Sequence, residues 1–488
     1  MVQHWQAIIG LEIHAQLKTE SKMFCSCRNG PEETAPNINV CEVCLGHPGS
    51  LPVINQEAVK KVIKTGLAFH CQIPQWTKFD RKNYFYPDLP KGYQISQYDQ
   101  PLAQKGWLEI QGRKIRITRI HLEEDTGRLV HLPKEQSALA DFNRAGIPLM
   151  EMVTEPDLRT GEEVREFAKE FQLVLRHLGV SEADMEKGQM RVEVNISLIR
   201  EGEELLSGTK VEIKNLNSFR AAKKAVDYEI TRQKAILEKG EKVVQETRGW
   251  DGSQTVFQRI KEGAADYRYF PEPDLPAFAL EPAWVEEIRR EIPELPAEKR
   301  KRFKKEYQLS ETEGETLIRN TFLASFFEKA ESELKNWAKV ENIPSAKYSR
   351  LRALLTNYLL TDFQGELEGY VGRKALVTPE NFAELIILIF QKKVSSPLAK
   401  RILKIMFEKG ADPSQVMKEE GLEQIGGEEE VERLVQKIIA ENTPAVKDYH
   451  QGKEEALQFL LGQLMQETRG QIDPRAAREK LQQFLQSP

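Results

Sequence analysis

A change of composition near residue 290 constrains the fold of this 488-residue chain more than any other feature. The preceding residues are rich in glycine, proline and turn pairs, and they contain short segments in which apolar and polar residues alternate, as in half-buried strands. Helical patterns lie between these segments, so this part is expected to be α+β, with a largely antiparallel sheet. The expected strands are residues 5–17, 114–120, 191–198 and 210–214, and the expected helices are residues 56–68, 161–177 and 218–238.

The rest of the chain is predicted to be helical. A basic run over residues 300–305 lies near its start, and glycines are few up to about residue 410. Thr378 and Pro379 fit the N-cap and first position of a helix, and Gly410 fits a helix end. We therefore expect three domains: an α+β domain over 1–292, an all-α domain over 293–410 and a small all-α tail over 411–488.

Charge and hydropathy exclude several classes of protein. The net charge is −5, from 70 basic and 75 acidic residues, so the chain is no globally basic nucleic-acid coat, although a local basic patch remains compatible. The longest apolar run, residues 385–390, has six residues, whereas a bilayer span needs about 20. No membrane partner is therefore expected. Five cysteines without a secretion signal favour a reducing compartment, and a cytoplasmic location is predicted.

Acidic side chains and a histidine recur beside the predicted strands. Glu12 and His14 would lie on one face of a strand, about 7 Å apart. Glu123 and Glu124 follow another strand, at a position where sites are often built. Together these residues favour a site for a hard divalent cation such as Mg²⁺, which would suit phosphoryl transfer. The alternative for Glu12 and His14 is a solvated strand face.

Glu151 is the most unusual of these acids, because it interrupts the apolar run 149–153. A lone carboxylate in such a run is costly unless it is paired or bound to a metal. Glu151 is therefore included in the predicted Mg²⁺ site. The alternative is a salt bridge to Arg144.

Basic and aromatic residues are interleaved over residues 79–88, and Lys91 follows them closely. Lys82, Tyr84 and Lys91 are candidates for contacts with a nucleotide, since such a mixture suits phosphate contact and base or ribose stacking. The chain has neither a Walker pattern nor G-x-G-x-x-G, so scattered groups would have to hold the nucleotide. The alternative is an aromatic mini-core with solvated bases.

Four of the five cysteines are clustered in the order C-x-C-x13-C-x2-C. Cys25, Cys27, Cys41 and Cys44 predict a closed, tetrahedral, structural Zn²⁺ site, with no open position for catalysis. The alternative is four reduced thiols, some of them in the core. Cys71 is left over and is predicted to be packed.

Six blocks of this sequence resemble one known family. They are GLEIH at 10–14, FDRKNYFYPD at 79–88, YQISQY at 93–98, HLEED at 121–125, GTKVEIKNLNSF at 208–219 and DYRYFPEPD at 266–274. These blocks are similar to those of the B subunits of bacterial aspartyl/glutamyl-tRNA amidotransferases, and the resemblance extends over the whole chain. It implies a cradle domain at the N-terminus, then a helical domain and a tail like the small YqeY proteins, with the last two binding tRNA.

The resemblance also implies a reaction and partners. An amidase-like A subunit would release ammonia from glutamine, and a small C subunit would join A to B. The B subunit would use ATP and Mg²⁺ to phosphorylate the side-chain carboxylate of Glu on tRNA(Gln) or Asp on tRNA(Asn). Ammonia arriving through a channel would then displace phosphate and leave the amide.

By the same match, residues of this chain acquire implied roles. Metal ligands would be Glu12, His14, Glu123 and Glu151, while Glu124 would be a ligand or would line the ammonia exit. Lys82 and Lys91, with Tyr84, would contact phosphate or nucleotide or line the channel. The choice between Glu123 and Glu124 stays open. Two other functions compete: a non-catalytic tRNA-binding scaffold, and an unrelated ATP-dependent carboxylate–amine ligase for a small molecule.

Overall fold

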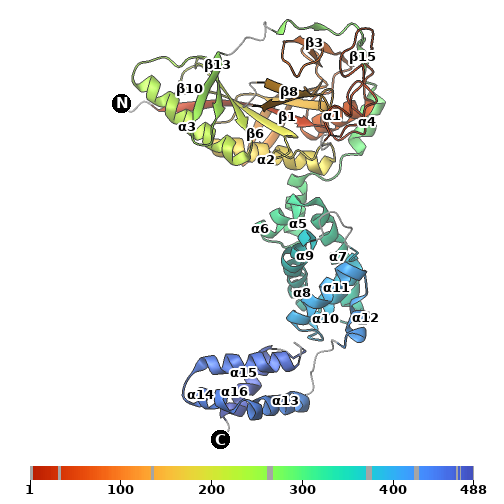
Figure 1. The fold of residues 1–488 in the computed structure, drawn as a ribbon, viewed down its shortest axis with the longest axis vertical. Coiled ribbons are helices and arrows are strands. Elements are labelled where there is room, and N and C mark those ends of the chain that lie inside the picture. Colours follow the sequence, from red (N-terminus) through yellow and green to blue (C-terminus); the bar gives the residue numbers. More distant parts are fainter. Residues whose placement is uncertain are drawn as a thin grey trace. The chain divides into compact units, whose positions relative to one another are not determined.

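The structure is a computed structural model that describes residues 4–30, 35–132, 137–260, 267–369, 376–421, 428–468, 471–472 and 474–486 (Figure 1). The chain divides into two compact units, residues 1–298 and residues 299–488. The first unit is mixed α and β, and the second is helical in its described residues, as expected. No helix among the described residues is long and apolar enough to cross a membrane.

An eight-stranded sheet forms the centre of the first unit, in the order β13-β12-β11-β10-β1-β9-β6-β5. Neighbouring strands are antiparallel except β11 and β12, which are parallel. This confirms the prediction of a largely antiparallel sheet. The strands are β1 (Trp5–Gln16), β5 (Ala103–Ile110), β6 (Arg113–Glu124), β9 (Pro148–Thr154), β10 (Met190–Arg200), β11 (Val211–Leu216), β12 (Glu246–Trp250) and β13 (Thr255–Ile260).

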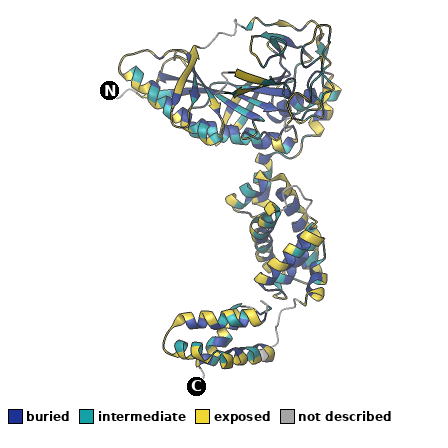
Figure 2. Ribbon diagram, in the orientation of Figure 1, coloured by how far each residue is buried: buried dark blue, intermediate teal, exposed yellow. Residues whose placement is uncertain are grey.

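The two faces of this sheet differ because its central strands alternate. In β1, Leu11 and Ile13 are buried in the main core, whereas Glu12 and His14 point to the opposite face. Three helices cover the apolar face: α1 (Gln56–Ala68), α2 (Gly161–Leu178) and α3 (Phe219–Glu238). Figure 2 shows the resulting buried centre and the exposed outer sides of α2 and α3.

Smaller elements complete the first unit. A three-stranded sheet, β14-β3-β4, contributes side chains that contact the polar face of the large sheet. The remaining elements are β14 (Phe270–Pro271), β3 (Asp80–Asn83), β4 (Tyr93–Ser96), the pair β15 (Phe278–Ala279) and β2 (Trp76–Thr77), the pair β7 (Arg128–Leu132) and β8 (Ser137–Asp141), and α4 (Pro282–Arg290).

A helical bundle follows, with a core of phenylalanines. Phe363 packs against Phe326, Phe382 and Phe407 in tilted and edge-to-face contacts, at centroid distances of 4.5–5.2 Å. Thr378 caps α10 and Pro379 begins it, as the sequence predicts. The helices are α5 (Pro296–Tyr307), α6 (Glu311–Arg319), α7 (Thr321–Val340), α8 (Ser345–Tyr358), the π-helical turn η2 (Leu359–Phe363), α9 (Gln364–Gly369), α10 (Pro379–Phe390), α11 (Ser396–Lys409) and α12 (Pro413–Glu419).

The last helices have an apolar core of their own, which includes Val435, Leu460 and Leu481. They are α13 (Glu428–Glu441), α14 (Thr443–His450), α15 (Glu454–Glu467) and α16 (Pro474–Gln486). The three-domain division stays a prediction. The structure adds that α12, which follows the predicted boundary at 410, lies against α10, because Ser414 donates a hydrogen bond to Glu384.

Glu384 makes the stability of the helical bundle depend on pH. Burial raises the pKa of this carboxyl to about 7, and the nearby Asp412 adds to the rise although the Ser414 hydrogen bond opposes it. The folded state therefore favours the protonated acid, and stability is lost as the pH rises from about 4.3 to about 7. We expect Glu384→Gln to raise the free energy of unfolding at pH 8 by about 2 kcal/mol and to change little at pH 4.

Urea denaturation of the full chain at both pH values measures this difference. Glu380→Gln is the comparison, since Glu380 lies on the same helix and is exposed. Its charge adds only a minor part to the raised pKa of Glu384, so a much smaller gain is expected. An equal gain from both substitutions at pH 8, or none from Glu384→Gln, would show that Glu384 is not the destabilising group.

Candidate active site

Polar side chains from neighbouring strands form a continuous band on the face of the large sheet that the helices leave free. The strand register explains the band: His14 of β1 lies opposite Glu151 of β9, and Glu151 lies opposite His121 of β6. On the other side of β1, Glu12 lies opposite Glu193 of β10. Residues far apart in the sequence therefore meet because antiparallel pairing aligns their side chains.

One part of the band is a cluster of two histidines and two carboxylates, His14, His121, Glu123 and Glu151, which we call the His–Glu cluster. Glu151 Oε2 lies 3.3 Å from His14 Nε2 and 3.2 Å from His121 Nε2. Glu123 is 3.8 Å from His14 and 3.7 Å from His121. Side-chain ligand atoms of His14, Glu123 and Glu151 lie within 4.8 Å of one another, so these three residues could hold a metal ion.

The electrostatics of the cluster keep its acids ionised. Burial alone would raise the pKa of Glu151, but His121 and His14 hold that pKa well below its usual range. Burial likewise opposes charge on both histidines, yet the facing carboxylates raise their pKa values. A divalent cation would supply the same counter-charge, with His14 neutral as a ligand.

The small sheet fixes Glu123 from its own side. Ser96 Oγ donates a hydrogen bond of 2.8 Å to Glu123 Oε2, and Gln94 Nε2 donates one of 3.1 Å to Oε1. Lys82 Nζ lies 3.8 Å from Glu123 Oε2; burial opposes its charge, but Glu123 and Glu151 raise its pKa well above the usual value. Tyr84 donates to Gln94 at 2.8 Å. The ammonium could contact a phosphate oxygen if the neighbouring carboxylates held a cation that offsets their charge.

A second group of acids lies beside the first. Glu12, Glu193 and Glu212, here the acidic triad, have carboxylate oxygens within 4.8 Å of one another. Asn195 Nδ2 donates to Glu12 at 2.8 Å, and Lys214 Nζ pairs with Glu193 at 2.9 Å. The structure therefore places Glu12 with this triad rather than with His14, although only one residue separates the two along the strand.

Glu124 points away from both groups, because adjacent residues of β6 face opposite sides. Lys91 Nζ contacts its carboxylate at 2.6 Å, and the Ile95 amide donates to it at 2.9 Å. This ion pair borders a cavity of about 110 Å³ that Cys25 and Cys44 also line. The two adjacent glutamates thus lie in different environments.

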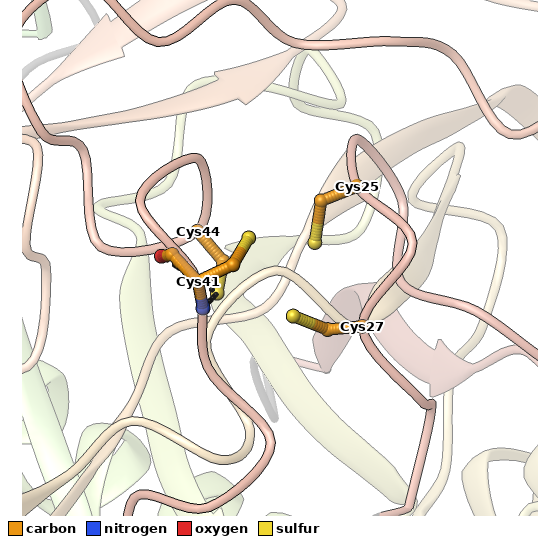
Figure 3. A group of neighbouring side chains, drawn as sticks. All are labelled: Cys25, Cys27, Cys41 and Cys44. Carbon is orange, nitrogen blue, oxygen red and sulfur yellow. Dashed lines mark hydrogen bonds between the residues drawn. The ribbon is translucent and has the colours of Figure 1, made fainter.

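The four clustered cysteines converge from two loops, as Figure 3 shows. Their sulfur atoms lie within 4.8 Å of one another, and none forms a disulfide. The Cys41 amide donates to Cys44 Sγ at 3.2 Å. This donor set fits tetrahedral zinc, for which Zn–S bonds of about 2.3 Å require sulfurs about 3.8 Å apart. Cys71 is buried in the main core, as predicted.

Gly46 brings the cysteine loop into close contact with Lys91. Its φ is +69°, and a Cβ there would lie 2.3 Å from Lys91 Cγ, close to the backbone end of that side chain, which cannot move away easily. We expect Gly46→Ala to break the Lys91–Glu124 ion pair and to cost about 1–3 kcal/mol beyond the backbone strain. Thermal unfolding measures the loss.

Gly49→Ala is the matched control, because Gly49 has a φ of +87° but no atom within 4 Å of the added carbon. Equal losses in the two variants would mean that only backbone strain matters and that the contact with Lys91 does not.

One alternative from the sequence proves wrong. Arg144 does not pair with Glu151: its guanidinium donates to the Thr126 and Gly127 carbonyls and lies 3.7 Å from Asp125. The aromatic mini-core is present only in part, since Phe79 is buried in the main core whereas Phe85 is 81% exposed.

Three further residues of the two groups, His121, Glu193 and Glu212, were not predicted from the sequence. His121 carried a usable signal, since it precedes Glu123 by two residues and so shares its face of the strand. Glu193 and Glu212 carried none, because only the pairing of β10 with its neighbours brings them to Glu12.

Comparison with known proteins shows the family of this chain. Residues 7–286 match the GatB/GatE catalytic domain, and residues 340–485 match the GatB domain. The B subunit of the aspartyl/glutamyl-tRNA(Asn/Gln) amidotransferase of Thermotoga petrophila is 44% identical over 494 residues, and that of Caldicellulosiruptor saccharolyticus is 45% identical over 490 residues, each match covering 99% of both chains. The chain belongs to this family of amidotransferase B subunits.

The resemblance of the six sequence blocks is thereby confirmed. Both groups of acids and the four cysteines of this amidotransferase B subunit lie within the part that matches the catalytic domain.

Proposed function

We propose that this protein uses ATP and Mg²⁺ to activate the side-chain carboxylate of Glu on tRNA(Gln), of Asp on tRNA(Asn), or of both. The observation that carries the proposal is the His–Glu cluster, where two buried carboxylates meet two histidines and a lysine on the open face of a sheet. The names of the relatives supply the tRNA substrates, and the residues supply the chemistry.

The cluster and the triad suit two neighbouring divalent cations. His14, Glu123 and Glu151 would hold one, and Glu12, Glu193 and Glu212 would hold the other. A bound Mg²⁺ would offset the negative charge that spreads over a transferring phosphoryl group. Lys82 would contact a phosphate oxygen, and Gln94 and Ser96 would keep Glu123 from rotating. Between the two adjacent glutamates, we propose Glu123 as the metal ligand.

The reaction would run in two steps. A carboxylate oxygen of the aminoacyl group attacks the γ-phosphorus of ATP, and ADP leaves, which gives an acyl phosphate. Ammonia then attacks the acyl carbon. Phosphate leaves with the carboxylate oxygen that was bonded to phosphorus in the first step, and the nitrogen loses one proton to give the amide. Activation is needed because an oxide is a poor leaving group, whereas phosphate is a good one.

Glu124 and Lys91 would act where ammonia arrives. Glu124 is an anion beside the cavity, and its chain neighbour Glu123 belongs to the His–Glu cluster. We propose that Glu124 accepts a proton from ammonium and that Lys91 holds Glu124 in position. The ammonia would come from an amidase-like A subunit, with a C subunit joining the two.

We also propose that the four cysteines hold a structural zinc ion and that the helical domain and tail contact tRNA. The tail has 9 basic and 15 acidic residues, a net charge of −6. It would therefore have to recognise the shape of tRNA through a few basic side chains rather than through its overall charge. Lys447, Lys453 and Arg469 are candidates for such contacts, and Arg469 lies outside the described residues.

The test is phosphate release by the complex of this chain with its A and C subunits. The mixture contains ATP, Mg²⁺ and misacylated Glu-tRNA(Gln) or Asp-tRNA(Asn), without an ammonia donor. ATP cleavage that requires the misacylated tRNA is the expected result. Absent cleavage with tRNA bound, persisting after ammonium is added, would favour the non-catalytic scaffold instead.

A further inference from the structure

Lys22 is an unusual residue of the first unit, because its side chain is fully buried, with 0% of its surface exposed. It follows β1, in the loop that leads to Cys25 and Cys27. A buried ammonium is costly unless an anion or several hydrogen-bond acceptors surround it. The partners of Lys22 therefore indicate what its charge is for.

Three acceptors surround the ammonium. Lys22 Nζ lies 2.7 Å from the Asn39 carbonyl oxygen, 3.4 Å from the Phe142 carbonyl oxygen and 3.6 Å from Cys44 Sγ. Within the described part of the chain, no carboxylate oxygen lies within 4.0 Å of Lys22 Nζ, the distance limit for an ion pair. The carbonyls offer dipoles but no charge, so Cys44 is the one acceptor of the three that can become an anion.

The backbone of Lys22 connects the same loops. Its amide donates to the Cys27 carbonyl at 2.9 Å, while its side chain reaches Asn39 and Cys44 on the second loop. The contact with Phe142 fixes both loops to the body of the domain. Lys22 thus lies where it can set the position of both cysteine pairs and the charge around them.

We propose that Lys22 is a positioning residue of the cysteine site, whose ammonium donates a hydrogen bond to the Cys44 thiolate and offsets part of the charge of a metal–tetrathiolate centre. Four thiolates around Zn²⁺ carry a net charge of −2, and one adjacent ammonium reduces it to −1. This inference rests on the structural zinc proposed above and is independent of the amidation reaction.

The test compares zinc retention in the full chain, purified with its partner subunits. Lys22→Met keeps the apolar stem but removes the charge, and we expect it to release zinc to a chelator at least about tenfold faster than the unchanged protein, as expected for the loss of a hydrogen bond to a metal ligand. With Co²⁺ in place of zinc, its sulfur-to-cobalt absorption bands are expected to shift. Lys18→Met is the control, since Lys18 is exposed four residues earlier and pairs with exposed Glu182.

The outcomes distinguish a role of Lys22 in the cysteine site from a role in holding two backbone carbonyls. Unchanged zinc release and unchanged cobalt bands in Lys22→Met would overturn the proposal and leave Lys22 as a support for two carbonyls. If Lys22→Met does not fold, Lys22→Gln, which keeps a donor without the charge, is measured instead against the same criteria. If the protein without any substitution binds no zinc, both this inference and the proposal of a structural zinc are overturned, whereas the amidation proposal stays intact.

Discussion

Glu151→Gln is expected to lower ATP cleavage and amidation by a factor on the order of 10³ while the domain stays folded. The amide keeps the shape of the side chain but removes the negative charge that faces His14 at 3.3 Å and His121 at 3.2 Å. A divalent cation would lose a ligand, and the developing charge on the phosphoryl group would lose its stabilisation. The rate of tRNA-dependent phosphate release measures the effect, with circular dichroism as the check on folding.

Glu109→Gln is the control for this variant. Glu109 lies on β5 of the same sheet but is exposed, and it belongs to neither group of acids. Its substitution is expected to leave the rate unchanged. A Glu151→Gln protein that folds and cleaves ATP at the unchanged rate would remove the His–Glu cluster from the reaction.

Cys41→Ser is expected to produce the largest loss of stability. Cys41 is one of four thiols from two loops, and within the described segments of these loops, residues 21–30 and 35–50, there is no helix or long strand. A metal that joins them would contribute its binding free energy to folding, on the order of 10 kcal/mol for structural zinc. We expect the bound zinc to fall from one ion per chain to near zero, and the first unit to unfold at a much lower temperature.

Cys71→Ala separates the metal from ordinary packing. Cys71 is buried in the main core outside the cysteine cluster. Its truncation is expected to cost about 1 kcal/mol and to leave the zinc content unchanged. Full zinc content in Cys41→Ser, measured by atomic emission, would contradict a four-thiolate site.

Local patterns predicted four strands of the large sheet, β1, β6, β10 and β11, because alternation along one strand already separates its two faces. The other four, β5, β9, β12 and β13, were not predicted. Glu12 and His14 were expected on the face opposite Leu11 and Ile13, and the structure places them there. Helix 56–68 was predicted from its helical pattern with the bounds that the structure has, and the structure adds that Asn55 caps it. Such features depend on neighbours in the sequence.

The division of the acids into two groups depended on strand pairing and could not be predicted. Glu12 and His14 share a face, but β10 lies on one side of β1 and β9 on the other, so each residue meets a different set of partners. The same applies to Glu123 and Glu124: alternation implies opposite directions, but only the fold shows that one meets the His–Glu cluster and the other meets Lys91.

Buried charged residues that belong to no sequence motif could not be predicted either. Lys22 appears in the sequence as an ordinary polar residue in a loop, and only the convergence of Asn39, Cys44 and Phe142 shows that its ammonium is enclosed. A sequence pattern reports spacing along the chain, whereas enclosure depends on three segments that meet in space.

The most direct measurement follows an oxygen atom of the aminoacyl side chain. Misacylated tRNA is prepared with ¹⁸O in both oxygens of the side-chain carboxylate and is converted to the amide by the complete complex with ATP and ammonium. If the carboxylate attacks the γ-phosphorus, the released phosphate carries one ¹⁸O and the amide keeps the other. Phosphate without ¹⁸O, formed at the same rate as the amide, would show that ATP is cleaved by water and would contradict an acyl phosphate at this site.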